Sequence, residues 1–324
     1  MRGGTRTEHP LDEDAVNNFR EYLRIPSVQP DVNYDECVNF FRRQAEGLDL
    51  PIKVIELTPH KPIVVITWEG EEPTLQSIML NTHMDVVPVY PEYWKYPPFS
   101  AEKDEEGNIY GRGAQDTKAA GIQYLEAIRR LKSDGIRLKR TIHITFMPDT
   151  TFHCKGTGGA PELLHSNTAA EKARLIIDKG GGDTPEVPDQ LDITFDMRVA
   201  VTQDHDQMAA MLQSWCDEAG PGVHISSRKM KRTEPTKLDN TNPWWRTFKT
   251  ECEDLGMTLK PVICPAAGDC RYLRQVGIPV LGFAPMINTQ VRMHDHDEYL
   301  NEQVFLRGID IYSHLIPAIA NLKV

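Results

Sequence analysis

Residue types that bind divalent metals occur at three places where a buried strand or an adjoining loop is expected. His83 and Asp85 follow an apolar run, Asp116 follows a glycine-rich turn, and residues 294–298 read His-Asp-His-Asp-Glu. In α/β enzymes, functional side chains lie just past the carboxyl ends of strands. Imidazoles and carboxylates are common metal ligands, and a carboxylate such as Asp85 commonly orients a metal-binding imidazole. The three motifs together favour a metal site.

Each motif also has a simpler explanation when it is taken alone. Asp116 is a residue that helix N-caps prefer. His83 is compatible with a hydrogen-bonded histidine of the core or surface, and residues 294–298 are compatible with a solvated acidic turn. The occurrence of all three motifs at expected strand ends favours the functional interpretation.

The elements that position these residues follow from the spacing of apolar side chains. Strands are expected over residues 53–57, 62–68, 77–80, 141–147, 191–199, 223–227, 259–264 and 280–283. Helices are expected over residues 14–23, 37–45, 116–131, 168–177, 206–219, 244–254, 271–276 and 303–319. The alternation predicts an α/β fold whose mixed, mostly parallel sheet is covered by helices on both faces. The pattern over residues 158–235 predicts a small antiparallel α+β insertion. It would separate the two parts of the larger domain, residues 1–157 and 236–324.

Composition excludes several classes of partner. The chain has 324 residues with 36 Lys+Arg against 47 Asp+Glu, a formal net charge of -11, which argues against nucleic acid because phosphate contacts need basic residues. No run reaches the roughly 18 apolar residues of a membrane span. Residues 1–14 have no apolar segment typical of a signal peptide. The six cysteines contain no CxxC pair, so we expect reduced thiols in a cytoplasmic protein.

Longer motifs around the candidate ligands resemble one enzyme family. Residues 82–88 read Thr-His-Met-Asp-Val-Val-Pro, residues 110–118 read Tyr-Gly-Arg-Gly-Ala-Gln-Asp-Thr-Lys, and residues 293–298 read Met-His-Asp-His-Asp-Glu. These motifs resemble those of the aminoacylase-1 family, within the dizinc exopeptidases and deacylases. Further matching blocks lie at residues 123–127, 196–199, 242–245 and 310–312. The similarity extends over most of residues 8–149 and 166–324.

The resemblance implies a role for each candidate ligand. It implies two zinc ions per chain, with His83 as a ligand of one ion, His294 as a ligand of the other, and the Asp116 carboxylate bridging both. It implies that Asp85 orients His83. Two such ions activate a shared water and polarise the scissile amide carbonyl. The implied reaction is hydrolysis of N-acyl-L-amino acids to a carboxylate and a free L-amino acid.

The resemblance also implies partners and a second domain. Arg198 and Arg271 are candidates to bind the carboxylate of a small-molecule N-acyl amino acid, because Arg makes bidentate contacts with carboxylates. An exposed salt bridge is an equally good explanation of either arginine. The family forms homodimers through a lid of four antiparallel strands and two helices, of which residues 158–235 would be an abbreviated form.

The chain departs from the family at the residues after the strand expected over 141–147. The family sequence Pro-Asp-Glu-Glu supplies a general base and a zinc ligand, whereas residues 148–151 read Pro-Asp-Thr-Thr. A Thr hydroxyl is not a base at neutral pH. A further family ligand, in an Asp-Glu-Gly segment, aligns with Asp178-Lys179-Gly180. The chain is also roughly eighty residues shorter than the family leads us to expect, with the shortage between residues 149 and 191.

These departures leave two hypotheses open. In the first, the chain is an aminoacylase whose missing zinc ligands are replaced by other residues, with Asp149, His153, Cys154 and Asp178 as the available candidates. In the second, the chain is a catalytically inactive aminoacylase-like protein that binds metal or an acyl-amino acid.

Overall fold

The computed structural model describes residues 6–148, 172–175, 193–196, 199–226, 233–263 and 269–323. The chain divides into two compact units, each formed by more than one segment. The first comprises Met1–Thr157, Lys237–Pro261 and Leu281–Val324, and the second comprises Gly158–Thr236 and Val262–Val280. Every expected ligand in the described part of the chain belongs to the first unit.

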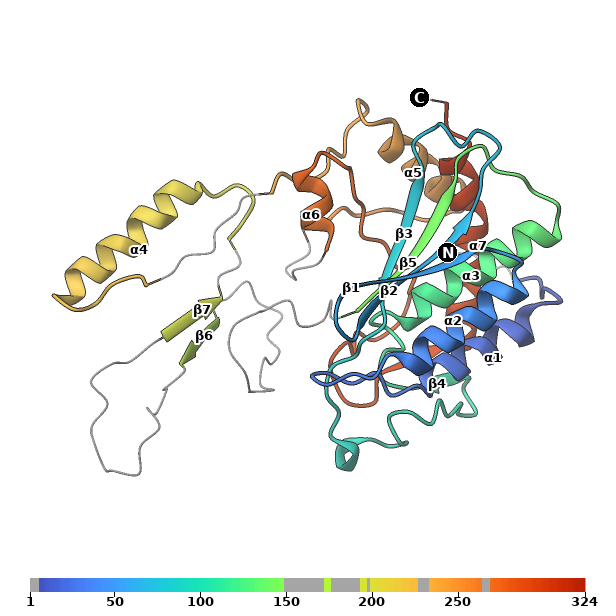
Figure 1. The fold of residues 1–324 in the computed structure, drawn as a ribbon, viewed down its shortest axis with the longest axis horizontal. Coiled ribbons are helices and arrows are strands. Elements are labelled where there is room, and N and C mark those ends of the chain that lie inside the picture. The colour runs from blue at the N-terminus through green and yellow to red at the C-terminus, as the bar shows by residue number, and fades with distance from the viewer. Residues whose placement is uncertain are drawn as a thin grey trace. The chain divides into compact units, whose positions relative to one another are not determined.

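A four-stranded mixed sheet forms the centre of the first unit (Figure 1). Its strands, in the order β1-β2-β5-β3, are β1 (Ile52–Thr58), β2 (Lys61–Trp68), β5 (Ile142–Met147) and β3 (Ile78–His83). The expected mixed α/β architecture is confirmed. The expectation of mostly parallel pairing was wrong for these strands, because β1–β2 and β2–β5 are antiparallel and β3–β5 is parallel. The short connection between β1 and β2 allows only an antiparallel pair, whereas β3 and β5 are joined through a crossover helix.

Helices pack on one face of this sheet through a continuous apolar core. Val64 lies opposite Phe146 in the register of β2 and β5, and both side chains are fully buried. Phe41 of α2 (Asp35–Gly47) stacks on Phe146 with 3.6 Å between ring centroids. Gly121 of α3 (Lys118–Ser133) lies on the same ring, where a Cβ atom would come within 2.8 Å of it. The glycine therefore lets α3 approach the sheet closely.

Two further helices complete this layer, while the other face is less covered. Figure 1 shows α1 (Asp12–Leu23) and α7 (Glu302–Ala320) beside α3. On the opposite face of the sheet, Val65, Thr67 and His143 are only half-buried. Among the described residues, the helical cover expected on both faces is thus complete on one face only. The helix expected over 244–254 is also present, as α5 (Pro243–Asp254).

A second, two-stranded sheet joins distant parts of the first unit. β4 (Asn108–Tyr110) pairs antiparallel with β8 (Tyr299–Asn301), with fully buried Ile109 opposite fully buried Leu300. Three-residue strands are too short to show a period of two, so the sequence analysis did not find them. Their pairing sets the loop that contains Asp116 beside the residues that contain His294.

In its described residues, the second unit contains an antiparallel pair of strands and two helices. β6 (Lys172–Leu175) pairs antiparallel with β7 (Ile193–Asp196), and α4 (His205–Ala219) and α6 (Cys270–Gln275) follow the expected helical patterns. The expected helix over 168–177 was wrong at residues 172–175. Their Lys-Ala-Arg-Leu sequence favours helix locally, but pairing with β7 overrides that preference.

Three expected strands are absent from the described residues. Residues 223–226, 259–263 and 280–283 adopt no strand, because a short apolar run becomes a strand only where a partner strand is available. The described helices include none that is long and apolar enough to cross a membrane. Four cysteines in the described part of the chain are free thiols: Cys37, Cys216, Cys252 and Cys270.

Candidate metal centre

The three expected metal ligands meet at the Asp116 carboxylate. His83 Nε2, at the end of β3, lies 3.1 Å from Asp116 Oδ1. His294 Nε2, in the loop before β8, lies 2.7 Å from Asp116 Oδ2. Each carboxylate oxygen therefore faces one imidazole, and the two imidazoles come from opposite ends of the chain. The His83 side chain is 10% exposed and that of His294 is 42% exposed, so solvent reaches the centre from the His294 side.

Both ring nitrogens of His83 face oxygen atoms. Nδ1 lies 2.9 Å from the Asp85 carbonyl oxygen and 3.3 Å from Asp85 Oδ1, while Nε2 faces Asp116. A neutral imidazole has only one N–H. If Nδ1 donates to Asp85, the Nε2 lone pair points at the Asp116 carboxylate, which is favourable only with a cation between them. A proton or a metal ion satisfies this geometry, so the donor set fits a metal.

The charges of the centre shift the pKa values of His83 and Asp116 in opposite directions, each toward its charged form. Burial disfavours the imidazolium of His83, but the carboxylates of Asp116 and Asp85 outweigh burial and raise the pKa of His83 well above its usual range. Burial likewise disfavours the carboxylate of Asp116, but His83 and His294 outweigh it and hold the pKa of Asp116 far below its usual range. Asp116 is therefore anionic, and the field beside it attracts cations.

A buried network holds Asp85 under His83. Asp85 is fully buried and accepts a hydrogen bond from Gln29 Nε2 at 3.1 Å. The backbone N–H of Gln29 donates to the Val86 carbonyl at 3.0 Å, and the Ser27 hydroxyl donates to the Met84 carbonyl. The segment around Gln29 is thus tied to the residues on both sides of Asp85. This arrangement suits a carboxylate that fixes the orientation of an imidazole.

If the centre held two ions, the described residues would offer two ligands to each. One position would have His83 and Asp116 Oδ1, and the other would have His294 and Asp116 Oδ2. Within the described ranges, no group of three or more His, Cys, Asp or Glu side chains is arranged to hold one ion. Catalytic zinc usually has three protein ligands, so each position lacks at least one ligand here.

The other residues singled out in the sequence are not placed at this centre. Arg198, Thr150 and Thr151 lie outside the described residues, as do the possible replacement ligands Asp149, His153, Cys154 and Asp178. Arg271 belongs to the second unit, where its guanidinium lies 5.1 Å from the centre of the Tyr272 ring. The substrate-binding role of both arginines stays a prediction.

The structure reveals a buried carboxylate that the sequence analysis did not assign. Glu298 is fully buried and accepts hydrogen bonds from Arg112 and from the backbone of the loop that contains Asp116. Both sequence-based interpretations of residues 294–298, a ligand cluster or a solvated turn, are wrong for this residue. The residues before the acidic cluster do not indicate its burial, since Ile287, Val291 and Met293 are exposed.

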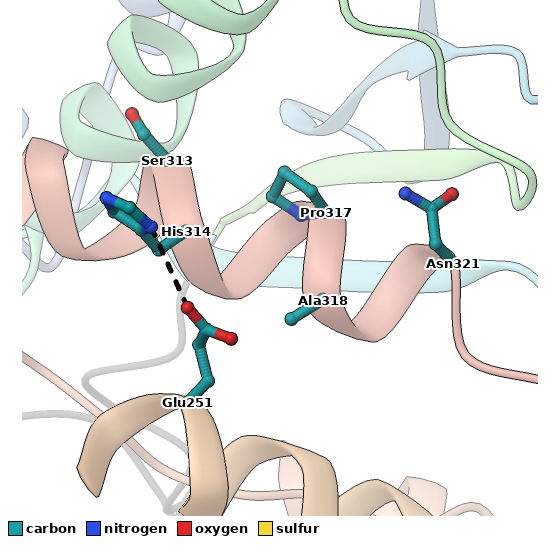
Figure 2. A pocket seen from close by; sticks show the side chains of 6 residues that line it. All are labelled: Glu251, Ser313, His314, Pro317, Ala318 and Asn321. Atoms are coloured by element: carbon teal, nitrogen blue, oxygen red, sulfur yellow. Dashed lines mark ion pairs between the residues drawn. The ribbon is translucent and has the colours of Figure 1, made fainter. Parts of the chain in front are cut away.

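A shallow hollow lies away from the centre, between α5 and α7 (Figure 2). Its volume is about 400 Å³, and its lining residues are Glu251, Ser313, His314, Pro317, Ala318 and Asn321. Its charged groups form one loose ion pair, 3.7 Å between His314 Nδ1 and Glu251 Oε1. None of the expected site residues lines this hollow.

A buried lysine beside the centre gives a testable pH dependence. Lys118 is fully buried and donates to the carbonyls of Tyr22 and Ile25, and burial lowers its pKa from 10.5 to about 8. Between these two pKa values the unfolded chain binds more protons than the folded chain, so stability rises with pH. We expect the free energy of unfolding to rise by about 2 kcal/mol between pH 7.5 and pH 9.5 through this group.

Urea unfolding of the wild type and of Lys118→Met at both pH values isolates this contribution. The difference in unfolding free energy between the two proteins should change by that amount, whereas other titrating groups cancel. A difference that is independent of pH would show that Lys118 keeps an ordinary pKa in the folded chain.

The chain belongs to peptidase family M20/M25/M40, whose sequence model matches residues 79–318. It is 38% identical to aminoacylase-1 of Homo sapiens, over 98% of this chain and 97% of the human protein. This similarity confirms the resemblance to aminoacylase-1, and family and homologues together indicate a metal-dependent amidohydrolase. The alignment runs over 401 positions and the chain has 324 residues, so at least 77 positions (401 less 324) have no counterpart here.

Solved structures of the same family share the fold. An M20 family metallo-carboxypeptidase from Sulfolobus solfataricus superimposes with a TM-score of 0.68 at 14% identity, covering 95% of this chain and 99% of that chain. A dinuclear metal binding peptidase of the M20 family from Bacillus subtilis superimposes with a TM-score of 0.62 at 15% identity, covering 96% and 98%. At these identities the likeness concerns the fold.

Proposed function

We propose that this chain hydrolyses N-acyl-L-amino acids to a carboxylate and a free L-amino acid with the help of zinc. The observation that carries the proposal is the Asp116 carboxylate with one imidazole on each oxygen, His83 at 3.1 Å and His294 at 2.7 Å. The aminoacylase-1 homologues support the substrate class, and the donor set of two imidazoles and a carboxylate suits zinc.

Each described residue has a defined task in this proposal. His83 and His294 would each hold one zinc ion, with Asp116 shared between the ions and Asp85 orienting His83. Bound zinc supplies a Lewis acid that polarises the amide carbonyl. Arg198 and Arg271 are proposed to bind the carboxylate of the substrate, because Arg makes bidentate contacts with carboxylates.

A second candidate function is binding of metal or of an acyl-amino acid without turnover. Thr150 and Thr151 favour it, because they replace the carboxylates that take up the proton of the attacking water and complete one ion's ligands in the family. The presence of only two ligands per ion among the described residues favours it as well.

Zinc content and acetate release distinguish the two functions. The purified chain is dialysed against zinc-free buffer, elemental analysis gives its zinc stoichiometry, and N-acetyl-methionine serves as the substrate. Two zinc ions per chain with acetate release that stops on chelation is the result expected for the hydrolase. Less than one zinc per chain without acetate release would contradict it and support the binding protein.

The proposal extends to assembly and location. The family dimerises through its lid domain, and we propose that a homodimer of this chain would use the second unit, where β6 and β7 form a two-stranded sheet. Such a sheet is marginal alone, so the dimer would be weak. The cytoplasmic location expected from the cysteine pattern stays a prediction.

A further inference from the structure

We propose that Glu298 is the positioning residue that holds Asp116 and His294 at their mutual distance and thereby sets the metal affinity of the centre. The inference rests on the proposed function for its consequence, metal binding. The positioning role of Glu298 itself rests on contacts that are present without a metal.

The Glu298 carboxylate accepts hydrogen bonds from several backbone groups of the loop that contains Asp116. Oε1 accepts from the backbone N–H groups of Gln115 at 2.7 Å and Asp116 at 3.1 Å. Oε2 accepts from the backbone N–H of Gly113 at 3.1 Å and from Arg112 Nη1 at 2.8 Å. Both oxygens are therefore fully used, and the loop has three of its amides fixed by one side chain.

The same loop is bound to the chain around His294 by its own side chains. Arg112 Nη1 also donates to the carbonyl of Asp295, next to His294, at 2.9 Å. Gln115 Nε2 donates to the carbonyls of Gln290 and Tyr299, and Gln115 Oε1 accepts from the backbone N–H of Arg292. Glu298 lies in the same segment as His294, so its bonds link that segment to the loop that contains Asp116.

The segment around His294 is an irregular loop with one backbone hydrogen bond across it, from the N–H of Asp295 to the carbonyl of Arg292 at 3.1 Å, so contacts with other segments contribute to its position. His294 has φ 66°, a left-handed conformation that L residues other than glycine rarely adopt. The neighbouring acidic side chains bind elsewhere: Asp295 accepts from the backbone N–H of His296, and Asp297 accepts from the backbone N–H of Lys95, 202 residues away in the sequence. Of these three carboxylates, Glu298 alone contacts the Asp116 loop in the described structure.

Glu298→Gln tests the inference because it keeps the size of the side chain. The amide nitrogen of Gln would face two donors in place of an accepting oxygen, so two of the four hydrogen bonds are lost. Glu126→Gln is the matched control. Glu126 is also a fully buried glutamate, accepting from Asn18 at 2.8 Å and Arg129 at 3.0 Å, and neither of these hydrogen bonds involves the metal centre.

Two measurements on the full chain separate positioning from general stability. In the metal-free protein, hydrogen exchange of a peptide that covers residues 111–118 should be at least tenfold faster in Glu298→Gln and unchanged in Glu126→Gln. Zinc affinity, measured by competition with a chromophoric chelator, should fall by about 10- to 100-fold in Glu298→Gln and stay within twofold in Glu126→Gln. Glu298→Asp, which keeps the charge, should fold and weaken zinc binding less.

Each outcome decides the inference. Equal exchange in the wild type and Glu298→Gln, or equal zinc affinity in Glu298→Gln and Glu126→Gln, would overturn it. If Glu298→Gln does not fold, hydrogen exchange and zinc affinity are compared between the wild type and Glu298→Asp instead. If the wild type binds no zinc, the proposed function fails, while the exchange comparison in the metal-free chain still decides whether Glu298 positions the loop.

Discussion

The double substitution Thr150→Glu/Thr151→Glu is expected to raise kcat for N-acetyl-methionine by about 10²–10⁴-fold, the usual contribution of one positioned general base. Thr hydroxyls do not accept a proton at neutral pH, whereas a glutamate with a pKa near 4.3 is ionised and basic. By the resemblance to the family, the second glutamate would add an anionic zinc ligand. Initial rates of acetate release at saturating substrate and fixed zinc measure the gain.

The single substitutions and an uncharged control separate the two contributions. Thr150→Glu should raise kcat with little change in zinc affinity, whereas Thr151→Glu should tighten zinc binding with a smaller effect on kcat. Thr150→Gln/Thr151→Gln has the same size without the charge and should leave both unchanged. A wild-type rate that the double substitution does not increase would contradict the assignment of the two positions.

Asp116→Asn is expected to abolish zinc binding at both positions of the centre and with it the hydrolysis. Asp116 places one oxygen 3.1 Å from His83 Nε2 and the other 2.7 Å from His294 Nε2. Asparagine offers a single neutral oxygen, and its amide nitrogen would face one of the imidazoles. Because each ion would have only one neutral imidazole besides Asp116 among the described residues, each would lose its only anionic ligand. Elemental analysis after dialysis measures the loss.

The histidine variants give a graded comparison for Asp116→Asn. His83→Ala and His294→Ala each remove one ligand of one ion, so each variant should retain at most one zinc per chain. Asp295→Asn is the matched control, since Asp295 is exposed and accepts from the neighbouring backbone N–H of His296. Full zinc content in Asp116→Asn would show that Asp116 caps a helix or pairs with histidine and does not bind metal.

The elements of the larger unit were predictable where apolar side chains repeat over several turns or along a full strand. The helices α1, α2, α3 and α7 were each expected within a few residues of their observed ends, because each buries one stripe of side chains in the core. The central strands were expected for the same reason. The direction of pairing was not predictable, because an apolar run does not indicate which neighbour a strand will have.

The candidate ligands were predictable from residue type, but the hydrogen bonds that hold them in place were not. His83, Asp116 and His294 belong to motifs that stand out in sequence, and the structure brings them together. Glu298 and Gln115 act through bonds to backbone groups nearly two hundred residues away. No local pattern encodes such a bond, because it depends on the β4–β8 pairing, and that pairing involves three residues on each side.

The β4–β8 pairing joins segments that are synthesised at different times, so the candidate metal centre cannot form until both have been made. His294 follows Asp116 by 178 residues, and ribosomes add about 5–20 residues per second, so roughly 9–36 s separate the two ligands. Throughout that interval α3 lacks α7, which packs against it in the finished protein. The early chain therefore exposes apolar helix surface that chaperones can recognise, and it has one imidazole and one carboxylate to offer a metal. The arrangement of both imidazoles on the Asp116 carboxylate is consequently possible only after residue 294 has been synthesised.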